Sequence, residues 1–237
     1  MIANYLNFIH YSKPDMERKM FLTEDGSHSI SIPGQEVSYH SKYGAIQESN
    51  HVFIQSGLIA QLSVHAELGI FEMGFGTGLN ALLTLIESEK EKKKIYYRAI
   101  EAFPLESSFV GRINYCSWLK RPDLQSVFYQ FHDCEWEKDI AITPHFTLYK
   151  IKTDFIEYTP DESVNIIYYD AFAPIAQPEL WTAEVFRKLF SMLVPGGILL
   201  TYCSKGAVQR AMKAAGFTVE KLPGPPHKRE IIRASKI

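Results

Sequence analysis

The sequence has few cysteines, no marked excess of either charge and no long apolar run. Its three cysteines, Cys116, Cys134 and Cys203, form no CxxC pair, which argues against a disulfide framework or a structural zinc site and favours a reduced compartment. With 25 basic against 27 acidic residues, bulk charge gives no sign of a nucleic-acid binder. No apolar run approaches the roughly 18 residues of a spanning helix, and the amino terminus lacks the features of a secretory signal. We therefore expect a cytoplasmic protein that holds no metal and does not enter a membrane.

What is present fits an ordinary globular chain of 237 residues, with 46% hydrophobic and 22% charged residues. Residues 1–50 are rich in Ser, Gly, His and Tyr and include the alternating stretch Ser29–Ile32, which predicts small hairpins or an irregular cap. The length allows one large domain with such an extension. We therefore divide the chain into an N-terminal extension (1–50) and a main domain (51–237).

Apolar strand patterns alternate with helical patterns along the main domain. Strands are predicted at 68–73, 95–101, 146–151, 164–170, 198–203, 217–222 and 230–234, and helices at 52–66, from 79 onward, and at 105–119, 178–192 and 207–215. This order predicts an α/β, Rossmann-like fold, in which a mostly parallel, seven-stranded sheet carries helices on both faces.

A glycine-rich turn follows the first of these strands. Gly74, Gly76 and Gly78, with Phe75 among them, let the backbone turn tightly and approach a ligand. The next strand ends at Glu101, about where a carboxylate accepts hydrogen bonds from the ribose hydroxyls of an adenosyl group. The pair predicts an adenosyl-cofactor site at the carboxyl edge of the sheet.

Glu72, just before the glycines, discriminates between adenosyl cofactors. A carboxylate repels a pyrophosphate, whereas it attracts the ammonium and sulfonium of S-adenosylmethionine. We therefore favour S-adenosylmethionine, although Gly76-x-Gly78-x-x-Ala81 also satisfies a dinucleotide fingerprint and the turn could serve packing alone. Asp154, beyond the third strand, is placed either to accept a hydrogen bond from the adenine amino group or to be a solvated loop aspartate.

A second carboxylate, Asp170, ends another apolar strand at the same edge and is followed by Phe172 and Pro174. This is where a methyl acceptor binds in such an architecture, although strand-end aspartates also form turns. Phe172, Trp181 and Tyr202 could form an aromatic wall for a planar substrate. Core packing is the other interpretation of Trp181, which lies on an apolar helix face.

Several ordered motifs together resemble the methyltransferase domain of the MnmC family. They are Phe71–Asn80 (FEMGFGTGLN), Asp170–Thr182 (DAFAPIAQPELWT), Pro195–Gly206 (PGGILLTYCSKG) and Ala215–Phe217 (AGF). An opening segment (Tyr39-His40-Ser41, Gly44-Ala45, Glu48, His51-Val52-Phe53) and a closing one (Gly224–Glu230) are also similar, so the likeness covers roughly residues 35–235. Two features depart from the family. His227 stands where a glycine is expected, and the chain stops at 237, so we expect the family's flavin-dependent oxidase half and its flavin to be absent.

The resemblance implies methyl transfer from S-adenosylmethionine to the primary amine of 5-aminomethyl-2-thiouridine at the tRNA wobble position. By it, the cofactor residues are Glu72, Gly74, Phe75, Gly76, Gly78, Glu101 and Asp154. Asp170 would face the amine in the catalytic site, and a separate enzyme would supply the aminomethyl precursor.

The tRNA partner requires a contact surface for the anticodon loop. Lys228 and Arg229 lie in a C-terminal stretch with a local excess of positive charge, which predicts phosphate contacts or, equally, a solvated terminal strand. Three other functions remain open: a methyltransferase for a small amine or another nucleobase, a non-catalytic cofactor-binding module, and a dinucleotide oxidoreductase.

Overall fold

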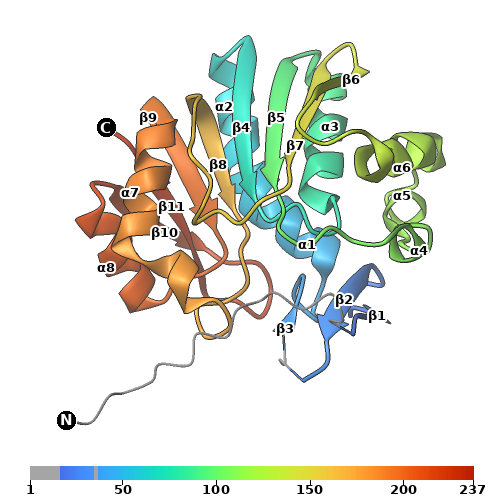
Figure 1. The fold of residues 1–237 in the computed structure, drawn as a ribbon, viewed down its shortest axis with the longest axis horizontal. Helices are drawn as coiled ribbons and strands as arrows, with labels where there is room; N and C mark the ends of the chain where they lie inside the picture. The colour runs from blue at the N-terminus through green and yellow to red at the C-terminus, as the bar shows by residue number, and fades with distance from the viewer. Residues whose placement is uncertain (1–16, 35–36) are drawn as a thin grey trace.

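The computed structural model describes residues 17–34 and 37–237, so residues 1–16 and 35–36 of the predicted extension lie outside the described part. Its centre is an eight-stranded sheet in the order β10-β11-β9-β8-β4-β5-β7-β6 (Figure 1). The strands are β4 (Glu67–Met73), β5 (Lys94–Ile100), β6 (Asp139–Thr143), β7 (Phe146–Ile151), β8 (Val164–Tyr169), β9 (Leu193–Thr201), β10 (Thr218–Pro223) and β11 (Glu230–Ser235). The central strands β7, β5, β4, β8 and β9 pair in parallel, whereas β11 is antiparallel to β9 and β10, and β6 to β7.

The fold class is the predicted one, with one strand more than expected. The extra strand, β6, extends the sheet by a hairpin with β7. Its residues are exposed or half-buried, and it holds only the short apolar run Ile140-Ala141-Ile142, for which no strand was predicted from the sequence.

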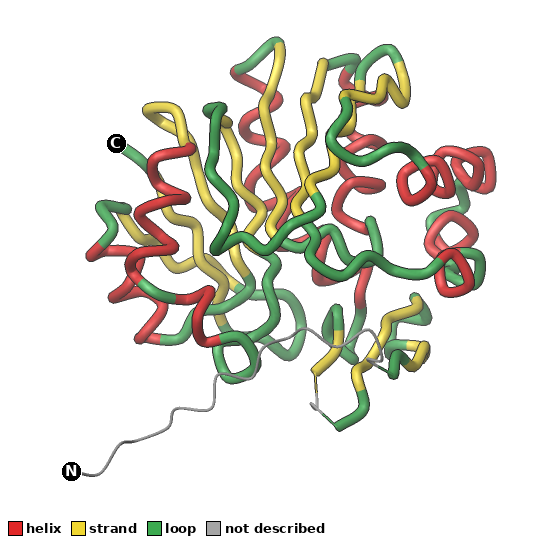
Figure 2. Tube along the Cα trace, viewed as in Figure 1, coloured by secondary structure: helices red, strands yellow, loops and turns green. Residues whose placement is uncertain are grey.

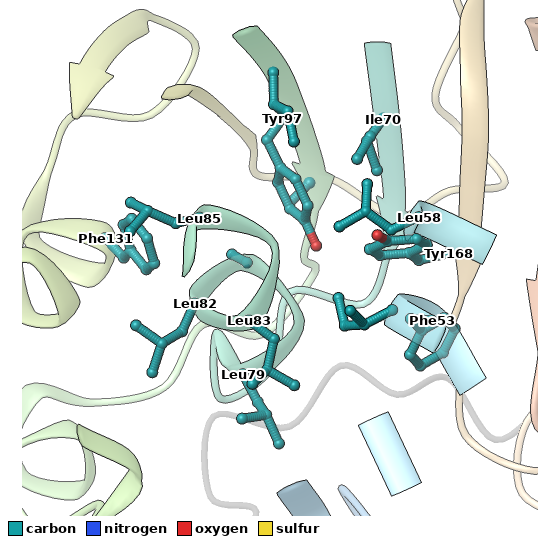
Figure 3. Packing of buried hydrophobic residues seen from close by; sticks show 14 of the residues in the cluster. Phe53, Leu58, Ile70, Leu79, Leu82, Leu83, Leu85, Tyr97, Phe131 and Tyr168 are labelled. Atoms are coloured by element: carbon teal, nitrogen blue, oxygen red, sulfur yellow. The ribbon is translucent and has the colours of Figure 1, made fainter. Parts of the chain in front are cut away.

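Helices cover both faces of the sheet (Figures 1 and 2). On one face, α3 (Leu79–Glu91) packs with the tyrosines of the strands beneath it, as Figure 3 shows for Tyr97 and Tyr168. On the other face lie α7 (Ala183–Met192) and α8 (Gly206–Ala214), over a second core that includes Tyr169. Because neighbouring residues of β8 point to opposite faces, Tyr168 and Tyr169 belong to different cores, as a strand buried on both sides requires.

One helical stretch joins the extension to the sheet. It consists of α1 (Ala45–Ser49), η1 (Asn50–Leu58), which has wider π-type turns, and α2 (Ile59–Val64). It begins before the predicted position 52 and runs across position 50, where we divided the chain; that division stays a prediction. At Gly57 an added Cβ would lie 2.0 Å from Leu200 Cδ1, so glycine permits the close approach of this stretch to β9.

The described part of the extension forms a small antiparallel sheet of β1 (Lys19–Leu22), β2 (His28–Ile32) and β3 (Val37–Ser38). Asn114 fixes this sheet to the main domain, since it accepts from His28 N at 2.8 Å and donates to Gly26 O at 2.9 Å. The helix predicted at 105–119 is wrong: it is broken into α4 (Ser107–Val110), which ends at Gly111, and α5 (Tyr115–Trp118), with Asn114 between them.

Two further regions differ from the prediction. The helix expected from 178 to 192 is divided at Thr182, whose side chain accepts from Val185 N and caps α7, so that Pro178–Trp181 forms the separate 3-10 turn η3. Residues 122–133, left unassigned by the sequence, form η2 (Pro122–Leu124) and α6 (Gln125–Asp133). Among the described helices, none combines the length and the apolar character needed to cross a bilayer.

Candidate active site

The predicted glycine turn lies at the carboxyl ends of the parallel strands and has a left-handed backbone. The φ angles are +88° at Gly74, +49° at Gly76 and +73° at Gly78, which residues with a Cβ rarely adopt. The amides of Gly74 and Phe75 both donate to Ile100 O at 3.1 Å, so the turn is closed over the end of β5. Three glycines are therefore used for one turn because each needs a positive φ.

We predict that Gly76→Ala destabilises the protein by about 2–4 kcal/mol, because left-handed strain is added to a steric clash. The added Cβ would lie 2.9 Å from Tyr39 Cδ1. Gly196→Ala is the matched control, since Gly196 has a φ of +79° and no atom within 4 Å of an added Cβ. Equal losses of unfolding free energy in denaturant titrations of the two variants would contradict the contact with Tyr39.

Asn80 links the two carboxyl groups that the sequence assigned to different roles. Its Nδ2 donates to Glu72 Oε1 and to Asp170 Oδ2, both at 2.9 Å. Sequence reasoning quoted Asn80 within the glycine motif but gave it no role. The predicted cofactor-binding carboxyl and the predicted catalytic carboxyl thus both accept a hydrogen bond from the Asn80 side chain.

Burial makes these carboxyl groups reluctant to ionise. Glu72 is 1% exposed, and burial raises its pKa well above 4.5, with the nearby Asp170 adding to the effect. Burial also raises the pKa of Asp170 to about 8, against the opposing effect of the bond from Asn80. Perturbed carboxyls gathered at a sheet edge are typical of a functional site.

The residues present fit a cationic cofactor. Two buried acceptors lie here: Asn80 Oδ1 makes no hydrogen bond within the described chain, and the Glu72 carboxyl, which is bonded to Asn80, also interacts with the Tyr97 hydroxyl. A ligand that brings N–H donors and positive charge would satisfy them, whereas a pyrophosphate would meet the carboxyls of Glu72, Glu101 and Asp170. These acceptors and carboxyl groups therefore suit the ammonium and sulfonium of S-adenosylmethionine. Within the described ranges, no group of three or more His, Cys, Asp or Glu residues is placed to hold a metal.

The other predicted cofactor residues lie around this turn. Glu101 accepts from Gly76 N at 2.9 Å and Phe103 N at 2.8 Å, and a carboxylate has further acceptor sites for a ligand. The Phe75 ring is buried, 5.2 Å from that of His132. Asp154 is exposed and its Oδ1 accepts from Ile156 N at 2.8 Å, an arrangement typical of a turn-forming aspartate; its adenine contact stays a prediction.

The opening segment lies over the glycine turn, which the sequence did not predict. The ring of Tyr39 contacts Gly76 and meets Phe172 edge-on, with 5.3 Å between ring centroids. His40 Nε2 is 2.9 Å from Thr77 Oγ1, inside the turn. Tyr39 therefore stands between the predicted cofactor side and the predicted acceptor side, and only its place in the family motif could have drawn attention to it.

The three residues of the predicted aromatic wall differ in how far they are exposed. Phe172 and Pro174 are half-buried, and Tyr202 is anchored by a bond from its hydroxyl to Ala171 O at 2.8 Å. Trp181 is 6% exposed and donates from Nε1 to Phe172 O at 2.9 Å. Trp181 therefore packs in the core and supports Phe172 from beneath; a direct substrate contact by Trp181 stays a prediction.

The basic C-terminal stretch offers fewer free cations than its composition suggested. Lys228 is ion-paired with Glu48, Arg233 with Glu220 at 2.8 Å, and Lys236 donates to Phe190 O at 3.0 Å. Arg229 keeps a side chain that is 93% exposed. These partners leave fewer free cations in the described C-terminal stretch, and phosphate contacts by Lys228 and Arg229 stay a prediction.

His227 adopts the backbone conformation that favours the glycine expected at this position. Its φ is +66°, the left-handed conformation for which glycine is preferred, and its ring stacks on Tyr43 with centroids 4.2 Å apart. The stacking holds the closing segment on the opening one without a glycine.

Comparison with known proteins identifies the family of the chain. A family model described as S-adenosyl-L-methionine-dependent methyltransferase matches residues 128–237. The tRNA 5-methylaminomethyl-2-thiouridine biosynthesis bifunctional protein MnmC of Pseudomonas fluorescens (strain Pf0-1) is 33% identical over 214 residues, which are 82% of this chain and 31% of that protein. MnmC of Stutzerimonas stutzeri (strain A1501) is 31% identical over the same shares. The chain thus spans about a third of the length of these curated relatives.

Two solved structures share the fold. MnmC2 from Aquifex aeolicus superposes with a TM-score of 0.74 and 21% identity, covering 94% of this chain and 71% of that one. Spermidine synthase from Thermotoga maritima gives 0.55 and 11%, covering 96% and 72%. Fold and site together define an S-adenosylmethionine-dependent methyltransferase, and the chain belongs to that family. Its relatives there are the MnmC proteins, of which it matches the methyltransferase part alone.

Proposed function

We propose that this protein transfers a methyl group from S-adenosylmethionine to the primary amine of 5-aminomethyl-2-thiouridine at the tRNA wobble position. The observation that carries the proposal is the 33% identity to a MnmC protein across 82% of the chain. The strand-end Asp170 beside the glycine turn supplies a group suited to an amine. The reaction would take place in the cytoplasm, where a separate enzyme would supply the aminomethyl base.

In this proposal the cofactor is held by residues of the glycine turn and its neighbours. They are Glu72, Gly74, Phe75, Gly76, Gly78, Glu101 and Asp154. S-adenosylmethionine supplies a methyl carbon that its sulfonium already activates. The residues around the turn orient this carbon toward the acceptor, and positioning provides most of the rate in such a displacement.

Asp170 would act on the acceptor amine in two ways. Its carboxylate accepts an N–H bond, which aims the lone pair and stabilises the positive charge that develops on nitrogen. An alkylammonium has a pKa of roughly 10, so an ordinary aspartate would be a poor base, whereas the pKa of Asp170 is raised to about 8. A bound ammonium stabilises the carboxylate and widens this difference again, so the role of Asp170 is to orient the amine and stabilise the cation, with little contribution as a base.

The direct test uses tRNA isolated from cells that lack this protein. We expect the purified protein to transfer labelled methyl groups to this tRNA stoichiometrically with its aminomethyl base, and nucleoside mass analysis to find the N-methyl product at that base. Labelling of a metabolite extract instead of tRNA would favour a small-amine methyltransferase. Tight cofactor binding without turnover on any tRNA would favour the non-catalytic module.

A further inference from the structure

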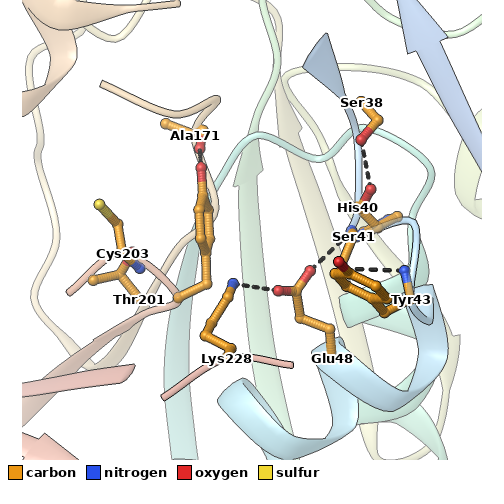
Figure 4. A network of polar contacts seen from close by, with 10 residues as sticks. Ser38, His40, Ser41, Tyr43, Glu48, Ala171, Thr201, Cys203 and Lys228 are labelled. Atoms are coloured by element: carbon orange, nitrogen blue, oxygen red, sulfur yellow. Dashed lines mark hydrogen bonds and ion pairs between the residues drawn. The ribbon is translucent and has the colours of Figure 1, made fainter. Parts of the chain in front are cut away.

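A lysine ammonium lies between a carboxylate and an aromatic face at the acceptor side of the site. Lys228 Nζ is ion-paired with Glu48 Oε1 (Figure 4). It also stands 4.5 Å from the centroid of the Tyr202 ring. The pair is well covered, with side-chain exposures of 28% for Lys228 and 13% for Glu48. The second oxygen of Glu48 accepts from Ser41 N at 3.0 Å, which fixes the carboxylate. A carboxylate and a ring face together bind a primary alkylammonium well.

This arrangement adjoins the predicted catalytic carboxyl. The Tyr202 hydroxyl is bonded to Ala171 O, the residue next to Asp170. The charge of Glu48 raises the pKa of Asp170 and that of Lys228 lowers it, so the three groups share one electrostatic environment. A cavity of about 70 Å³ also borders Glu48 and Lys228, on the side of Tyr43 and His227, where the opening and closing segments meet.

We propose that Glu48 and the Tyr202 ring form the binding site for the primary ammonium of the acceptor, and that Lys228 occupies this site until the acceptor arrives. The inference rests on the proposed function for the identity of the acceptor. Lys228 ends in the same chemical group as an aminomethyl substituent, so one site accommodates either. On displacement, the ammonium of Lys228 is free to pair with a phosphate.

The alternative is that Lys228 and Glu48 only clasp the closing segment to α1. The two roles predict opposite effects of removing the lysine. If the ion pair only holds the closing segment, substituting either Lys228 or Glu48 removes the same interaction. If it is an occupied amine site, substituting Lys228 leaves the site vacant, whereas substituting Glu48 removes the site itself. Substituting each partner, and both, therefore separates the two roles.

The experiment measures binding of n-propylammonium chloride by ligand-observed NMR, independently of any tRNA. We expect Lys228→Met to bind it at least about tenfold more tightly than the wild type, because the internal competitor is gone, and Lys228→Met/Glu48→Gln to show no such gain. Lys138→Met is the matched control, since Lys138 forms an exposed ion pair with Glu135 at 3.1 Å. S-adenosylmethionine affinity, measured for each variant, checks that the site is folded, and Lys228→Gln serves as a second lysine variant.

Kinetics with amine-bearing tRNA complete the test. Glu48→Gln should raise the KM for tRNA by about tenfold or more, because the acceptor ammonium loses its carboxylate. The proposed amine site is overturned if Lys228→Met binds n-propylammonium no better than the double variant does. It is also overturned if Lys228→Met and Glu48→Gln lose affinity for n-propylammonium equally. If the ammonium binds as expected but the wild type never methylates tRNA, the amine site stands and the proposed function fails.

Discussion

Asp170→Asn should lower kcat for methyl transfer by about 10²–10³-fold and change the S-adenosylmethionine Kd by less than about threefold. The amide keeps the shape of the side chain and an oxygen that can accept a hydrogen bond. It carries no charge to stabilise the cation that develops on nitrogen. Single-turnover rates and cofactor titrations measure the two effects separately. Asp123→Asn, at an exposed aspartate paired with Arg121, is the matched control.

The same variant tests the raised pKa of Asp170. Because the carboxyl must be ionised to act, kcat/KM of the wild type should rise with pH through an inflection near 8, the pKa to which burial raises it. In Asp170→Asn this inflection should vanish, while the ionisation of the amine itself remains. An unchanged profile, or full activity of the variant, would remove Asp170 from the catalytic site.

Glu72→Gln should separate cofactor binding from stability. We expect the S-adenosylmethionine Kd to rise by about 10–100-fold, because a buried charge that meets the cofactor's cation is replaced by a neutral group. In the absence of cofactor the variant should melt a few degrees higher than the wild type, since a buried carboxylate no longer has to be accommodated. Calorimetric titration and thermal unfolding measure the two effects.

The pH dependence of this gain has a definite sign. The pKa of Glu72 is raised in the folded state above 4.5, so between the two pKa values the folded protein binds more protons than the unfolded chain. Its unfolding free energy therefore falls as the pH rises through that window, and the advantage of Glu72→Gln should be larger at pH 8 than at pH 5. Glu91→Gln, on the exposed end of α3, should change neither property. A lower melting temperature of Glu72→Gln at pH 8 would contradict the buried-carboxylate argument.

The general position of the site followed from the sequence because parallel strands bring their carboxyl ends to one edge. The strands that end before Gly74, Glu101 and Asp170 were each recognisable from their apolar runs, and β4 pairs with both β5 and β8. Proximity of the three groups is then a consequence of topology, whatever the details of packing. The glycine turn could also be predicted from the sequence, since positive φ angles favour glycine at these positions.

The partners of the polar side chains were decided only by the tertiary structure. Lys228 pairs with a carboxylate 180 positions away in the chain, Asn80 bridges two carboxyls from separate strands, and Tyr39 covers Gly76. A sequence of alternating strands and helices dictates which edge a residue reaches, because backbone pairing and burial impose a local period. It does not dictate which of several nearby charges a flexible side chain meets, because that choice depends on how distant segments pack against one another.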